Sequence, residues 1–83
     1  MRRAAGKKLE AMRRNPKGDW QIDDIVTVAE AFGFTVRRGG GSHATLSHPN
    51  LAEILTVPAR KPIKPVYVRR LVDAIDDLVG GDE

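Results

Sequence analysis

The sequence predicts an α+β fold, in which helices pack on one face of a small three-stranded antiparallel sheet in the order α-α-β-β-β-α. Apolar residues recur at helical spacing before residue 34 and again after residue 64. Between these segments the apolar period changes to two, as in a strand. Glycine and proline clusters separate the short alternating segments, which favours tight antiparallel connections.

Two helices are predicted in the first part of the chain. A short helix over residues 7–14 ends before the proline and glycine of a turn at residues 15–18. A second helix follows, with Gln21 as N-cap and Gly33 in the left-handed position after its last turn. Its apolar face consists of Ile22, Ile25, Val26, Ala29 and Phe32.

Three short strands are predicted next, over residues 34–37, 43–47 and 54–57. A glycine-rich connection at residues 38–42 joins the first two, and a turn at residues 48–50 follows the second. Three strands on one side of a helical layer bury one sheet face and leave the other open.

A last helix begins at Pro65, a residue that suits the first helical position, and ends at Gly80. Its apolar face consists of Val68, Leu71, Val72, Ile75 and Leu78. Strand alternation turns six apolar side chains toward the helices, namely Phe34, Val36, Ala44, Leu46, Leu55 and Val57. The same alternation predicts His43, Thr45 and Ser47 on the open face.

The length and composition of the chain indicate one small globular domain. The 83 residues include no cysteine, so disulfides and thiolate zinc sites are excluded, as is usual in a reducing cytoplasm. We expect a single domain over residues 1–83, with a core of about 7–79, a basic tail at 1–6 and an acidic tail at 80–83. No apolar run suits a signal peptide or a membrane span, so we expect a cytoplasmic protein without a membrane partner.

Basic residues gather in two zones of the sequence. Residues 1–18 contain seven of them against Glu10 alone. Around the histidine segment, five more face only Glu53: Arg37, Arg38, Arg60, Lys61 and Lys64. Two basic zones on a small domain suggest a polyanionic partner, while the alternative is a solvated basic surface that keeps the protein dispersed.

Both histidines of the chain, His43 and His48, lie just after the glycine run 39–41. The run precedes a strand and lacks the lysine of a phosphate-binding loop, so it is either a loose hairpin turn or a bare backbone that lets a large polar substrate approach His43. Two histidines five residues apart form no recognisable metal-ligand set. What remains is His43 as a general base or acid, with nearby cations steadying negative charge; the alternative is an ordinary surface histidine.

A set of landmarks along the chain resembles the HicA family of toxin–antitoxin systems, over roughly residues 7–78. The landmarks are Asn15-Pro16-Lys17, Gly33-Phe34, Arg37-Arg38, Gly41-Ser42-His43, Leu55-Thr56-Val57-Pro58 and Ile63-Lys64-Pro65. The resemblance implies a fold like that of double-stranded-RNA-binding domains and an activity as an mRNA interferase, an endoribonuclease that needs no metal and no cofactor. It also implies a HicB-type antitoxin as the protein partner that covers the site.

In that family the histidine of Gly-Ser-His is catalytic, which here assigns the role to His43. A neutral imidazole can take the proton of an RNA 2′-OH, which then attacks the adjacent phosphate. The residues expected to contact RNA are Arg37, Arg38, Gly41, Ser42, Thr45, Arg60, Lys61 and Lys64.

The chain departs from the family pattern at two positions. Many relatives carry further histidines where this chain has Ala44 and Arg60. With His43 as the general base, the general acid would then be His48 or a water molecule, and Arg60 would contact phosphate. A noncatalytic RNA-binding module that uses the same sheet face remains an alternative, as does a protein-interaction domain whose basic surface docks an acidic partner.

Overall fold

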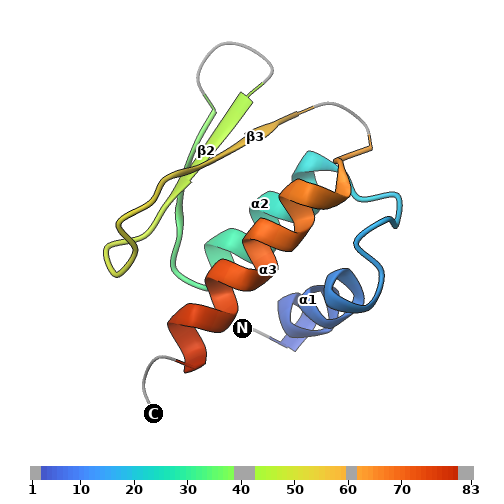
Figure 1. Cartoon of the computed structure of the whole chain (residues 1–83), viewed down its shortest axis with the longest axis horizontal. Helices are drawn as coiled ribbons and strands as arrows, with labels where there is room; N and C mark the ends of the chain where they lie inside the picture. The colour runs from blue at the N-terminus through green and yellow to red at the C-terminus, as the bar shows by residue number, and fades with distance from the viewer. Residues whose placement is uncertain (1–2, 39–42, 60–61, 81–83) are drawn as a thin grey trace.

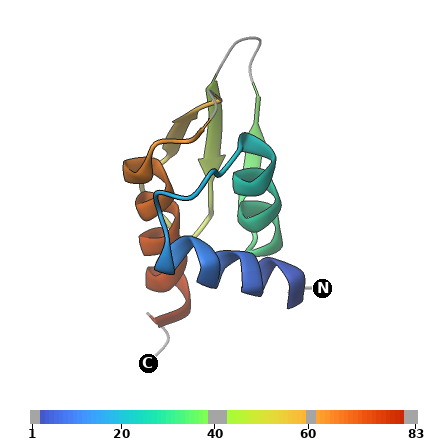
Figure 2. The same ribbon diagram turned by 90° about the vertical axis from the view of Figure 1, so that its right-hand side faces the viewer.

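The computed structural model describes residues 3–38, 43–59 and 62–80. Its elements are α1 (Arg3–Arg14), α2 (Ile22–Ala31), β1 (Thr35–Arg37), β2 (His43–Ser47), β3 (Leu55–Pro58) and α3 (Pro65–Gly80). The α+β class and the order α-α-β-β-β-α are therefore as predicted. The sheet forms one layer, α2 and α3 cover one of its faces, and α1 runs across these two helices on the side away from the sheet (Figures 1 and 2).

Helix α1 begins at Arg3, four residues earlier than expected. The residues 3–6, expected in a basic tail, are thus helical. The physical reason is that Ala5 extends the apolar stripe of Leu9 and Met12 by one turn, and its side chain is 3% exposed. At the other end of the chain α3 stops at Gly80, and the remainder of the expected acidic tail, 81–83, lies outside the described residues.

Helix α2 has the ends that the sequence predicts. At its start the Asp24 carboxylate accepts a hydrogen bond of 3.0 Å from the backbone N–H of Gln21. At its end Gly33 has a φ of 93°, and the Phe34 N–H donates to the carbonyl of Ala29 over 3.0 Å. This turn places Phe34 in the core, 5% exposed, immediately before the first strand.

The sheet is antiparallel with the strand order β1-β2-β3. β2 has the predicted bounds. The other two strands differ by one residue: Phe34 and Ile54 precede β1 and β3, and Pro58 is the last residue of β3. The predicted alternation is confirmed by burial, since Ala44 and Leu46 are 0% exposed and belong to the cluster that packs under the helices.

Ion pairs attach α1 to the rest of the molecule. Lys8 Nζ lies 2.9 Å from Asp24 Oδ1 on α2, and the Arg13 guanidinium pairs with Glu10 and with Asp76 on α3. The hydrogen bond to Asp76, followed by the one to Glu10, raises the pKa of Arg13. Two basic residues of the N-terminal zone, Lys8 and Arg13, therefore form ion pairs within the fold.

Candidate functional site

The open face of the sheet presents polar side chains from all three strands. Arg37 of β1 lies opposite Thr45 of β2, and Thr45 lies opposite Thr56 of β3. His43 lies two residues before Thr45 on the same face of β2, and its strand partner is Pro58. Directly opposed side chains in such a sheet are about 5 Å apart and diagonal ones about 7–8 Å, so Arg37, Thr45 and His43 form one group.

His43 is exposed at the beginning of β2, in the position that the sequence predicts for it. Beside it, Thr45 Oγ1 donates a hydrogen bond of 3.4 Å to the backbone carbonyl of Arg37. This bond joins β1 to β2 on the open face. The imidazole is thereby presented on a sheet whose neighbouring strand is fixed, rather than on an isolated loop.

Arg38 does not join this group. Its Nη1 lies 3.7 Å from Asp23 Oδ1, in the first turn of α2, on the helix side of the sheet. The reason is the strand period of two, which turns consecutive side chains to opposite sides. Arg38 therefore lies on the other side of the sheet from Arg37 in this structure, and its role as an RNA contact stays a prediction.

His48 does not approach His43 either. The two residues are five positions apart along β2 and its following turn, which separates their Cα atoms by about 16 Å in an extended strand. The ring of His48 packs edge-on against Phe34, with centroids 5.2 Å apart, and its Nδ1 accepts a hydrogen bond of 3.0 Å from the Asn50 N–H. Its contacts serve the turn, and the geometry gives no support to a role as acid at His43.

The other predicted contact residues divide into two groups. Lys64 is exposed in the residue before α3, where its backbone carbonyl accepts the N–H of Tyr67 over 3.0 Å. This lysine ends the connection that leaves β3 at Pro58, the partner of His43. Four predicted residues lie outside the described part of the chain: Gly41, Ser42, Arg60 and Lys61.

Thr56 is a residue of the open face that sequence reasoning missed. It is exposed, and it continues the row of Arg37 and Thr45 onto the edge strand. The signal for it was present, because Thr56 alternates with the buried Val57 and the half-buried Leu55. Its hydroxyl extends the hydrogen-bonding capacity of the face beside His43.

The N-terminal basic zone lies apart from this face. Its exposed cations Lys7 and Arg14 belong to α1, which packs on the helices and not on the sheet (Figure 2). Lys7 and Arg14 on α1 and Arg37 on the sheet thus lie on separate surfaces. Within residues 3–38, 43–59 and 62–80, no group of three or more His, Asp or Glu side chains could hold a metal ion. None of the helices described has the length and apolar character needed to cross a membrane.

One known protein family matches this chain. The model of the family described as the HicA toxin of bacterial toxin–antitoxin systems matches residues 22–76, which is most of the chain. The chain belongs to the HicA toxin family. No curated protein and no solved structure matches it.

The HicA match begins at the first residue of α2 and ends in α3, so it contains the whole sheet with His43, Arg37 and Thr56. It leaves α1 outside. The match also contains Ala44, where many HicA relatives carry a second histidine. Ala44 is 0% exposed and faces the helices, so a side chain at this position would not share the open face with His43.

Proposed function

We propose that this HicA-family chain is a metal-independent endoribonuclease that cleaves mRNA, with His43 as the general base. The observation that supports the proposal most directly is the exposed imidazole of His43 on an open sheet face that also carries Arg37 and Thr45. RNA needs an accessible surface with cations for phosphates and hydrogen-bonding groups for the 2′-OH, and these three side chains provide both.

The chemistry assigned to His43 is proton removal from the 2′-OH of the nucleotide at the cleavage point. The 2′-oxygen then attacks the adjacent phosphorus, the bond from phosphorus to the 5′-oxygen breaks, and a 2′,3′-cyclic phosphate remains. Arg37 and Lys64 are the described cations that would stabilise the charge on the phosphate oxygens. The 5′-oxygen leaves with a proton from water or from the imidazolium that the first step created.

A second candidate function rests on a specific observation. Among the described residues His43 is the one imidazole of the open face, because the ring of His48 packs against the core residue Phe34 instead. A face with one imidazole and several hydroxyls also suits a noncatalytic RNA-binding module, in which shape and phosphate contacts give affinity with little sequence choice.

In either role the same face is the natural target of an inhibitor. We propose that a HicB-type antitoxin in the cytoplasm covers His43 and Arg37, since one partner on the open sheet face would block the base and a phosphate contact together. A third class, a protein-interaction domain without RNA affinity, would use the same cations for an acidic partner and would bind no RNA at physiological salt.

The test is RNA cleavage by purified protein in EDTA, comparing the natural chain with His43→Ala and His43→Gln. The proposal expects cleavage by the natural chain alone, products that end in a 2′,3′-cyclic phosphate, and no cleavage of a strand with 2′-deoxyribose at the cleavage point. If RNA stays intact at stoichiometric protein but binds in a salt-dependent way, the noncatalytic RNA-binding module replaces the nuclease as the proposed function. Equal cleavage by His43→Ala would overturn the role of His43.

A further inference from the structure

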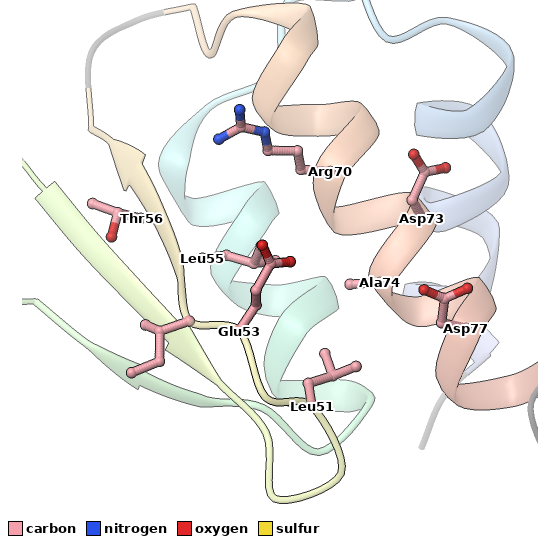
Figure 3. A pocket seen from close by; sticks show the side chains of 9 residues that line it. Leu51, Glu53, Leu55, Thr56, Arg70, Asp73, Ala74 and Asp77 are labelled. Atoms are coloured by element: carbon pink, nitrogen blue, oxygen red, sulfur yellow. The ribbon is translucent and has the colours of Figure 1, made fainter.

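We propose that the groove between β3 and α3 binds an extended, basic protein segment, which adds to the sheet as a fourth strand along β3. The groove has a volume of about 500 Å³ and lies on the edge of the molecule away from β1. One wall is β3 with the segment before it, and the other wall is α3 (Figure 3). The proposal goes beyond the nuclease function and does not depend on it.

The backbone of β3 supplies the first argument. Within the described part of the chain, the strand order places β3 at the edge of the sheet, where it pairs with β2. The N–H and C=O groups on its outer side have no strand partner in the described sheet, and Leu55 and Thr56 of β3 line the groove. Such an edge accepts an extended segment through main-chain hydrogen bonds, unless charges or a covering element prevent it.

The charge of the rim decides what kind of segment fits. Glu53, Asp73 and Asp77 line the groove, are exposed, and make no ion pair within the described part of the chain. Figure 3 shows Asp73 and Asp77 projecting side by side from α3, with Glu53 on the opposite wall. By contrast, acids that the fold itself uses are paired, as in the contacts of Asp24 with Lys8 and of Asp76 with Arg13.

Glu53, Asp73 and Asp77 bring three carboxylates to one groove on a chain whose net charge is +3. Among the described residues that line the groove, Arg70 is the one cation, and its guanidinium carbon lies 5.9 Å from the centre of the Tyr67 ring. The local excess of negative charge would repel RNA and an acidic partner and would attract lysine or arginine side chains. The groove is thus complementary to a basic partner, whereas the open face suits an acidic one.

The apolar part of the groove indicates an alternating segment. Leu51, Leu55 and Ala74 also line the groove, and Ile54, the residue before β3, is 64% exposed. Successive side chains of an added strand point to opposite faces. Lysines on the helix-facing side would lay their methylene stems over Leu55 and Ala74 with the ammonium at Asp73 and Asp77, and apolar residues on the other side would cover Ile54.

The experiment uses the full chain and a short capped peptide in which Lys and Val alternate. Binding is measured by calorimetry, and its location by backbone amide shifts and hydrogen exchange of isotope-labelled protein. We expect shifts concentrated in residues 54–58 and 70–77 and slowed exchange in β3. The variant D73N/D77N should weaken binding about tenfold, while D19N/E30Q, which removes as many exposed acids elsewhere, should change it by less than about twofold.

Two further peptides separate strand addition from simple charge attraction. A peptide in which Glu replaces Lys should not bind, and one of equal charge with a central proline should bind much more weakly, because proline lacks the N–H for the sheet. His43→Ala should bind the Lys–Val peptide as the natural chain does. Equal binding of the proline peptide, equal effects of the two double variants, shifts confined to the open face, or no binding would overturn the proposal. Self-association of the chain that D73N/D77N abolishes would identify a second copy as the occupant and would equally overturn it.

Discussion

Arg37 and Arg38 are neighbours in the sequence but project to opposite sides of the sheet. Arg37 lies opposite Thr45 on the open face, whereas the Arg38 guanidinium lies 3.7 Å from Asp23 on α2. One residue along a strand is enough to change a candidate substrate contact into a contact within the fold. The pair therefore offers a matched test of which face meets RNA.

Arg37→Ala is expected to weaken RNA binding and to lower the dependence of log K on log salt by about 0.7, the contribution of one phosphate contact on single-stranded RNA. Arg38→Ala removes an equal charge from the other side and should leave that slope nearly unchanged. Fluorescence anisotropy with labelled RNA over a salt series measures both. If the two variants lose affinity and slope equally, the open sheet face is not the RNA-binding surface.

His48→Ala is expected to destabilise the fold without changing catalysis. The variant loses the Nδ1 acceptor of the Asn50 N–H and the edge contact with Phe34, which together are worth about 1–3 kcal/mol in the free energy of unfolding. His48→Asn should recover the hydrogen-bonded part, because an Asn side chain also accepts the N–H two residues on. Urea unfolding measures the stability.

RNA cleavage per folded molecule provides the control for His48. Both variants should cleave RNA at the natural rate, because His48 lies far along the strand from His43. A rate that falls in His48→Ala at unchanged stability would restore His48 as the acid, in conflict with its packing against Phe34.

Periodicity was sufficient to predict the order of the helices and strands and the open face, because each is a local pattern, although it missed the start of α1. Ala44 and Leu46 alternate with His43 and Thr45 in the sequence, and burial follows that alternation without exception in β2. Local patterns do not contain the contacts between distant elements. The Arg38–Asp23 pair joins residues fifteen apart through the meeting of α2 with β1, so sequence reasoning grouped Arg38 with Arg37.

The groove between β3 and α3 was missed for a related reason. In the sequence, Asp73 and Asp77 lie outside the apolar face predicted for the last helix, and Ile54 is the first residue of a predicted strand. Only the packing of α3 beside the sheet edge brings these residues to one place. The start of α1 was missed because Arg3 and Gly6 are atypical of a buried helix, and the burial of Ala5, which is 3% exposed, is a property of the folded molecule.

The Asp24 carboxylate makes stability depend on pH in the acid range. Burial alone would raise the pKa of Asp24, but the hydrogen bonds from Lys8 and from the Gln21 N–H, with the charge of Lys8, together lower it below its ordinary value of 3.8. The unfolded chain therefore binds this proton more readily than the folded one. The stabilisation is fully present above the ordinary pKa and is lost as the pH falls through the lower, folded pKa.

The measurement is the free energy of unfolding in urea for the natural chain and Asp24→Asn over a pH series. The natural chain should exceed the variant by a constant amount above about pH 5, and the difference should shrink below the ordinary pKa. Lys8→Met, which removes the cation, should reduce the same difference. A gap that stays constant down to the lowest pH would show that the carboxylate charge contributes nothing.

Met12 tests whether α1 belongs to the core of this HicA protein, although the family match begins only at residue 22. Met12 is 0% exposed and is part of the cluster that packs against α2 and α3. Met12→Ala should lower the free energy of unfolding by about 2–5 kcal/mol, since it removes buried methylenes and leaves a cavity. Val66→Ala, at a side chain that is 45% exposed, should cost less than about 0.5 kcal/mol.

A chain that begins at residue 22 extends the test of α1. Without α1 the outer faces of α2 and α3 meet water, and a small domain has only about 5–15 kcal/mol of stability in total. We expect this shortened chain to lose cooperative urea unfolding and to expose apolar surface to a fluorescent dye. If it unfolds cooperatively at the midpoint of the full chain, and Met12→Ala is as mild as Val66→Ala, then α1 is an appendage, and the sheet with two helices is the complete folding unit.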